Sequence, residues 1–164
     1  MPGYAPRSGP GEKTDGEGER IEMGFGKKRR QEREAVGLYL HIPFCRSKCD
    51  YCDFYSLAGR EDRMDEYQKA LMTHLKETAQ TAGEVAADTV YFGGGTPSYY
   101  GAKRLKALLG EVKKRFSVEK TAEITVEANP DSADFRSLRT LRKAGFNRLS
   151  LGMQSASLEE LAAV

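Results

Sequence analysis

The sequence has very little cysteine, and all of it lies in one place. The three cysteines of this 164-residue chain fall between positions 45 and 52. An odd number of clustered thiols excludes the disulfide framework of a small secreted protein, because one thiol would remain unpaired. The chain also lacks the apolar segment of a secretory signal at its start and any apolar run near the roughly 20 residues of a membrane span. We therefore expect a cytoplasmic protein with no integral membrane segment.

An excess of charge of either sign is also missing. The chain has 26 lysines and arginines against 24 acidic residues, a formal net charge of +2, which gives no general field for nucleic acid or acidic lipid. Hydrophobic residues make up 39% and charged residues 30%, which is typical of a globular domain. Residues 1–34 are rich in glycine, proline and charge and have no apolar period, so we predict a disordered leader there. We expect one domain in residues 35–164.

From position 36, short apolar runs alternate with amphipathic segments. The first run, "VGLYLHI", is nearly continuous, which is typical of a strand covered on both faces. The "NPDS" stretch predicts a turn and helix cap before Phe135, and Ser157 with Glu160 predicts a capping box. The expected strands are 36–42, 88–92, 123–128 and 147–155, and the expected helices are 61–80, 102–116, 135–144 and 157–164.

Four successive strand–helix units predict an α/β fold with a parallel sheet and right-handed crossovers, either open and doubly wound or part of a (β/α) barrel. Both architectures bind ligands at the carboxyl ends of the strands. The cysteines follow the first predicted strand, "GGGTP" follows the second, "EANP" ends the third and "GMQS" follows the fourth. Turn formation explains each stretch alone but not the coincidence of all four, so we expect a binding site at this end of the sheet.

The cysteine spacing, C-x3-C-x2-C, indicates a metal or redox centre. Three thiolates can bind three irons of a [4Fe-4S] cluster and leave the fourth iron open for a substrate. The main alternative is a zinc ion bound by the three cysteines and His41, although zinc usually draws its ligands as pairs from two segments. Three unliganded structural thiols are the remaining alternative. The spacing favours the cluster, because His41 lies on a predicted strand only four residues before Cys45.

Two further stretches offer groups suited to ligand binding. Gly93, Gly94 and Gly95 have no side chains, so their backbone could approach a ligand closely; the alternative is a simple turn that ends a strand. Glu127 is a carboxylate at the end of the apolar "ITVEA" strand, where burial without a partner is costly. An exposed glutamate at the strand end is the alternative for that position.

The cysteine motif, with Tyr51 directly before the last cysteine, resembles that of radical S-adenosylmethionine (SAM) enzymes. The stretches "YLHIPFC", "CDYCDFYS", "YFGGGTPS", "VEANP" and "NRLSLGMQS", between positions 37 and 155, are similar, in order, to the branch that contains oxygen-independent coproporphyrinogen III oxidase and the haem chaperone HemW. Phe54 stands where the oxidases carry a further cysteine, and Asn129 where they tend to have aspartate. Both departures favour the haem chaperone type, which delivers haem to client proteins, over the oxidative decarboxylase of haem biosynthesis.

The resemblance implies the ligands and partners. Cys45, Cys49 and Cys52 would hold a [4Fe-4S] cluster whose open iron binds SAM, and reduction would yield a 5′-deoxyadenosyl radical. Other implied partners are haem or a porphyrin, with His41 as a candidate neighbour, an electron donor and a haem-protein client. The residues implied to bind the cofactors are Tyr39, beside the cluster, and, at SAM, Tyr51, Gly94, Gly95, Thr96, Glu127 and Gln154.

Members of this branch resemble a six-unit partial (β/α) barrel followed by a carboxyl-terminal domain. The present sequence accounts for four units, so we expect residues 35–164 to be the amino-terminal part of a truncated radical SAM core domain. Its last strand would present an open edge, which predicts poor solubility. We also expect such a chain to bind a cluster more readily than it turns over.

Overall fold

The structure is a computed structural model that describes residues 35–162. The predicted disordered leader, 1–34, lies outside the described residues. The strands are β1 (Val36–Ile42), β2 (Phe44–Cys45), β3 (Leu57–Ala58), β4 (Ala86–Gly94), β5 (Ser117–Ala128) and β6 (Arg148–Leu151). The helices are α1 (Met64–Ala82), α2 (Pro97–Tyr100), α3 (Ala102–Arg115), α4 (Phe135–Ala144) and α5 (Leu158–Leu161), with 3-10 turns η1 (Glu61–Arg63) and η2 (Pro130–Ser132).

The predicted α/β fold with a parallel sheet is confirmed. Strands β1, β4, β5 and β6 pair in parallel, in that spatial order. Spatial order therefore follows chain order without a reversal. In a doubly wound sheet the order in which successive strands are added reverses at a switch point. In a (β/α) barrel each new strand is added beside the preceding one, on the same side. Of the two predicted architectures, the described sheet has the order of a barrel segment.

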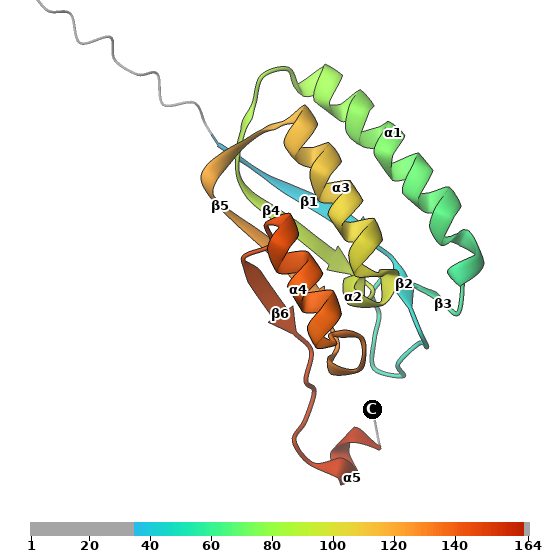
Figure 1. Cartoon of the computed structure of the whole chain (residues 1–164). Coiled ribbons are helices and arrows are strands. Elements are labelled where there is room, and N and C mark those ends of the chain that lie inside the picture. Colours follow the sequence, from blue (N-terminus) through green and yellow to red (C-terminus); the bar gives the residue numbers. More distant parts are fainter. Residues whose placement is uncertain (1–34, 163–164) are drawn as a thin grey trace, which may run out of the picture. The chain divides into compact units, whose positions relative to one another are not determined.

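Helices α1, α3 and α4 cover one face of this sheet (Figure 1). Leu40 and Phe92 point into the resulting core, together with Leu108 of α3 and Leu141 of α4. The opposite face is open in the part of the chain that the structure describes. The prediction that the first strand is covered on both faces is therefore wrong: Tyr39, on the open face, is 58% exposed.

Three strands differ in length from the prediction, and the first, β4, extends two residues beyond each end of the expected 88–92. β5 begins at Ser117, six residues earlier than expected, because its polar first half pairs with the start of β4, with Ala86 opposite Ser117. β6 ends at Leu151 rather than at 155. Gln154 has a φ of 62°, the left-handed conformation, so the chain beyond β6 leaves the sheet.

The predicted helix starts are confirmed only in part. Ser157 caps α5 by accepting a hydrogen bond from the Glu160 N–H, but the Glu160 carboxylate accepts from the Ser155 hydroxyl. The Ser157 N–H donates to Ser155 instead of to Glu160, so the capping box does not close. "NPDS" forms η2, and α4 is capped by Asp134.

The predicted open edge is present at β6, which pairs only with β5 within residues 35–162. Leu149 and Leu151 point to the helix-covered side but remain 40% and 47% exposed, because no described element packs beyond them. Among the described helices, none is long and apolar enough to cross a membrane.

Candidate functional site

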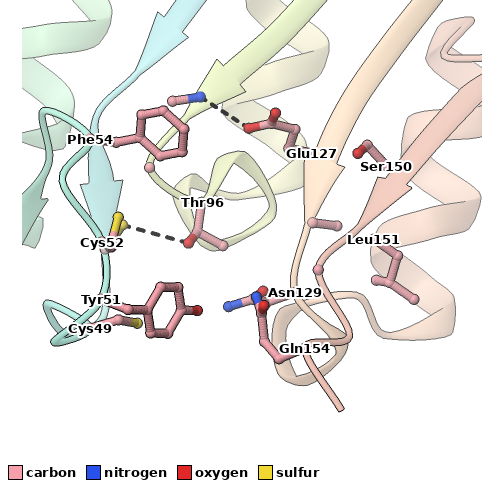
Figure 2. A pocket seen from close by; sticks show the side chains of 15 residues that line it. Cys49, Tyr51, Cys52, Phe54, Thr96, Glu127, Asn129, Ser150, Leu151 and Gln154 are labelled. Carbon is pink, nitrogen blue, oxygen red and sulfur yellow. Dashed lines mark hydrogen bonds between the residues drawn. The ribbon is translucent and has the colours of Figure 1, made fainter. Parts of the chain in front are cut away.

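A cavity of about 360 Å³ lies at the carboxyl ends of β4, β5 and β6, beside the cysteine-containing loop (Figure 2). Sequence positions far apart meet here, as the rule for parallel sheets predicts. Three residues considered for the site from the sequence do not line the cavity: Tyr39, His41 and Gly93. The predicted residues that do line it are Cys45, Cys49, Tyr51, Cys52, Gly94, Gly95, Thr96, Glu127 and Gln154.

The cysteine loop, residues 46–56, is closed at its base by short-range pairing. β2 and β3 form a two-stranded parallel pair, and the Leu57 N–H donates to the Pro43 carbonyl at 2.7 Å. Across the loop, the Lys48 ammonium donates to the Phe54 carbonyl at 2.8 Å. These bonds hold the loop in a defined conformation within the described structure, so its thiols are presented on one side of the cavity.

The three cysteines are half-buried, and the sulfur of Cys45 accepts a hydrogen bond. The Thr96 hydroxyl, at the start of α2, donates to Cys45 Sγ at 3.6 Å. The Cys52 N–H donates to the Cys49 carbonyl at 3.1 Å, which forms a tight turn between these two cysteines. An exposed ion pair, Arg46 with Asp131 at 3.0 Å, connects the loop to η2. Exposed pairs contribute little to stability, so this one mainly orients the loop.

His41 is poorly suited to complete a zinc site. Its Nε2 lies 3.1 Å from the Tyr55 carbonyl oxygen, and its Nδ1 lies 3.2 Å from the Tyr39 hydroxyl. Since a carbonyl can only accept, Nε2 carries the hydrogen, and in the neutral ring Nδ1 accepts from Tyr39. Both nitrogens are therefore engaged.

The arrangement of the cysteines also bears on the choice of metal centre. Within residues 35–162, no three side chains of the metal-binding types converge on one point as a single ion requires. A cubane cluster distributes its thiolates over separate irons, so its ligands need not converge in this way. Three half-buried thiols on one cavity wall therefore suit a cluster better than zinc.

The glycine-rich turn after β4 has already used its amide donors. The N–H groups of Gly95 and Thr96 donate to the carbonyls of Ile42 and Phe44, each at 2.8 Å, and the Gly94 N–H donates to Glu127. A Cβ on Gly95 would lie 2.8 Å from backbone atoms of Pro43 and Phe44, so packing within the protein requires this glycine. The groups that this turn can still offer a ligand are carbonyl lone pairs.

Glu127 is half-buried and bonded through both carboxylate oxygens. Oε1 accepts from the Tyr91 hydroxyl at 2.6 Å, and Oε2 accepts from the Gly94 N–H at 3.0 Å. These bonds offset the cost of burying the carboxylate. The bond from Tyr91 also raises the pKa of its phenol, because ionisation of the phenol would break this hydrogen bond to Glu127; burial adds to the effect.

The far wall of the cavity carries amides. Figure 2 shows Asn129 and Gln154 close together and facing the ring of Tyr51. A Cβ on Gly152 would lie 3.0 Å from Asn129 Oδ1 and 3.1 Å from Gln154 Nε2, so the glycine leaves room for both amides. Burial, followed by the charge of Cys49, raises the pKa of Tyr51.

Sequence reasoning did not assign some residues of the site. Phe54, Asn129, Ser150 and Gly152 also line the cavity. Ser150 pairs with Glu127 in the parallel ladder, so the register of β5 and β6 was the signal needed to find it. Because the sequence alone does not give that register, Ser150 could not be identified as a site residue.

Tyr39 lies on the open face of β1, below the rim of the cavity. Its ring stacks on Tyr91 with the centroids 6.0 Å apart and the planes at 24°, and its hydroxyl contacts His41. The assignment of Tyr39 to cofactor binding remains a prediction.

Charge within the cavity is of one sign. Glu127 and the three cysteines supply anionic or ionisable groups, and within the described residues no lysine or arginine lines the cavity. Such a cavity favours a ligand that is cationic or is held by a metal.

The sequence is similar to a known protein family and to several known proteins. The sequence profile of the Radical SAM superfamily matches residues 39–163. The haem chaperone HemW of Escherichia coli (strain K12) is 39% identical over 77% of this chain, and HemW of Mycobacterium tuberculosis (strain H37Rv) is 40% identical over 79%. In each case the match covers 34% of the relative. The oxygen-independent coproporphyrinogen III oxidase of Bradyrhizobium diazoefficiens is 35% identical over 74% of this chain and 27% of its own length.

A solved structure agrees with these relatives. Coproporphyrinogen III oxidase (HemN) from Escherichia coli, described as a radical SAM enzyme, superimposes with a TM-score of 0.72 at 32% identity, over 76% of this chain and 29% of that one. The chain thus spans about a third of the length of the relatives that it matches. With the family profile matching more than half of its residues, the chain belongs to the radical SAM superfamily.

Proposed function

We propose that this chain is a haem chaperone of the HemW type, a radical SAM protein that binds a [4Fe-4S] cluster and SAM and delivers haem to client proteins. The observation that carries the cofactor part is a single cavity. It joins the three cysteines to the Gly94–Gly95 turn, Glu127 and the amide wall. The haem part is supported by similarity to HemW proteins of several bacteria.

In this proposal each wall of the cavity has its own task. Cys45, Cys49 and Cys52 hold the cluster, which when bound supplies the electron for reductive cleavage of SAM. The carbonyls of Gly94 and Gly95 accept hydrogen bonds from the ammonium group of SAM, and Glu127 offers a fixed negative charge nearby.

The remaining residues orient the nucleoside half of SAM. The Tyr51 ring provides a flat surface for the adenine, and Gln154 supplies a polar contact. The absence of lysine and arginine from the lining of the described cavity also supports this ligand. Since no cationic side chain lines the described cavity, the carboxylate of SAM would have only the open iron as a positively charged partner.

A second candidate is oxidative decarboxylation of coproporphyrinogen III. The structural likeness to HemN favours it. Against it, Phe54 occupies the position where the resemblance places a further cysteine in the oxidases. Its exposed ring, at 72%, lines the cavity without offering a thiol.

Anaerobic reconstitution of the 164-residue chain with iron and sulfide tests the cofactor part. We expect a reduced-cluster electron paramagnetic resonance (EPR) signal that changes when SAM is added. Zinc without acid-labile sulfide would refute this part and favour a zinc-stabilised binding module. A Cys49→Ser variant, prepared in parallel, controls for iron that is adsorbed elsewhere.

Two assays then separate the chaperone from the oxidase. Absorbance titration with haem, followed by transfer to an apo haem protein, is expected to show stoichiometric binding and release. The oxidase would instead release 5′-deoxyadenosine coupled to decarboxylation of coproporphyrinogen. That coupling without haem binding would contradict the chaperone proposal.

A further inference from the structure

Tyr91 lies outside the cavity but contacts the one carboxylate among the described residues that line it. Its hydroxyl donates to Glu127 Oε1 at 2.6 Å, while the Gly94 N–H donates to Oε2 at 3.0 Å. Both donors belong to β4, and Glu127 is on the neighbouring strand β5. The carboxylate is thus held across the strand pair by one donor on each oxygen.

Two donors constrain the carboxylate more than one. A single bond to the Gly94 N–H would leave the carboxylate free to rotate about its last torsion, which is broad for glutamate. The second bond, to the Tyr91 hydroxyl, fixes that rotation. At 2.6 Å it has the length of a strong hydrogen bond between a hydroxyl and a carboxylate.

Tyr91 is itself held in place. Its ring stacks on Tyr39, and a Cβ on Gly93 would lie 2.7 Å from the Tyr91 ring and 3.1 Å from Glu127 Cδ. Glycine at position 93 therefore leaves the space that the pair occupies. The pKa of Tyr91 is raised by the bond to Glu127, so the phenol keeps its proton and remains a donor.

We infer that Tyr91 is a positioning residue that fixes the Glu127 carboxylate toward the cationic part of a ligand in the cavity. This inference rests on the proposed function, in which SAM, with its ammonium and sulfonium groups, is that ligand. Tyr91 acts through Glu127 and does not line the cavity itself.

The test compares SAM affinity by calorimetry on the cluster-loaded chain. Tyr91→Phe removes only the hydroxyl and is expected to weaken binding about five- to tenfold, while Glu127→Gln weakens it about tenfold or more. The double variant should bind about as Glu127→Gln does, since the hydroxyl has no effect without its carboxylate. Tyr99→Phe is the matched control, because Tyr99 donates to another glutamate, Glu61, outside the cavity.

A second readout needs neither cluster nor SAM. In the cluster-free chain labelled with ¹³C at glutamate side-chain carboxyls, Glu127→Gln identifies the Glu127 resonance. We expect Tyr91→Phe to shift that resonance and Tyr99→Phe to leave it in place. An unshifted resonance in Tyr91→Phe overturns the contact itself.

The outcomes separate this inference from the proposed function. A wild-type chain that holds a cluster but does not bind SAM contradicts the proposed function. Wild-type binding that Tyr91→Phe leaves unchanged, or a double variant whose losses simply add, contradicts the positioning role alone. Equal thermal unfolding of the wild type and Tyr91→Phe excludes a loss of fold as the cause.

Discussion

The Thr96 hydroxyl donates a hydrogen bond to Cys45 Sγ, and its removal should lower the reduction potential of the cluster. Thr96→Val replaces the hydroxyl with a methyl group and keeps the branched shape. The backbone is fixed independently, because the Thr96 N–H donates to the Phe44 carbonyl at 2.8 Å and the Thr96 carbonyl accepts from the Tyr99 N–H at 2.9 Å. The variant should therefore change one hydrogen bond and little else.

The magnitude follows from the strength of that bond. A hydrogen bond to Cys45 Sγ stabilises the reduced cluster more than the oxidised one, because reduction adds negative charge. If the difference is about 1 kcal/mol, typical of the net value of one hydrogen bond, the potential falls by about 40 mV for a one-electron couple. The 3.6 Å separation is that of a weak donor–sulfur contact, so we expect no larger effect.

The assay is an anaerobic redox titration followed by EPR, without SAM, on reconstituted wild type, Thr96→Val and Thr96→Ser. Thr96→Ser keeps the hydroxyl and should titrate close to the wild type. Iron and sulfide content must match among the three proteins. A Thr96→Val potential equal to or above that of the wild type would refute the reasoning.

Three other changes have defined outcomes. Cys49→Ser should abolish the cluster signal but leave the far-ultraviolet circular dichroism intact, because Cys49 lies in a loop at the carboxyl ends of the strands and is not part of the hydrophobic core; a lost dichroism signal would contradict this. Gln154→Gly should weaken SAM binding, measured by calorimetry. The same change should leave the free energy of unfolding unchanged or raise it by up to about 1 kcal/mol, because Gln154 has a left-handed backbone conformation that is strained for a residue other than glycine. A clear loss of stability would contradict this expectation. Leu108→Ala, at a fully buried site, should cost about 2–5 kcal/mol in urea denaturation; a cost under about 1 kcal/mol would show that the core is looser than described.

The main elements of the fold could be predicted because their hydrophobic patterns are strong. The apolar run that became β1 indicated a strand, and the helical spacing of Leu105, Leu108 and Leu109 indicated the helix α3. The first half of β5, "SVEKTA", has no apolar run, and it is a strand because β4 pairs with it. The two-residue strands β2 and β3 depend on a contact across the cysteine loop, which no local pattern encodes.

Most residues of the candidate site could also be predicted, because of the topology of the sheet and not because of hydrophobic patterns. The rule that parallel strands end at one edge places Cys45, Gly94 and Glu127 together without knowledge of the register. Tyr91 could not be found in this way, because its role depends on which residue of β5 its side chain faces. Tyr39 lies three residues before the end of β1 and does not line the cavity, and its assignment to cofactor binding stays a prediction.

The hydrogen bonds that stabilise the fold also determine which charged and polar groups line the cavity. The turn at Gly94–Thr96 uses its N–H donors to hold β1, β2 and Glu127, and the same bonds leave the cavity rich in acceptors. Three thiols and one fixed carboxylate add negative or ionisable groups, while no described cationic side chain lines the cavity. Under the proposed function, iron and a ligand that carries positive charge would balance these groups. The hydrogen bonds of the turn therefore account for much of the acceptor-rich lining on which the proposal of a cationic cofactor rests.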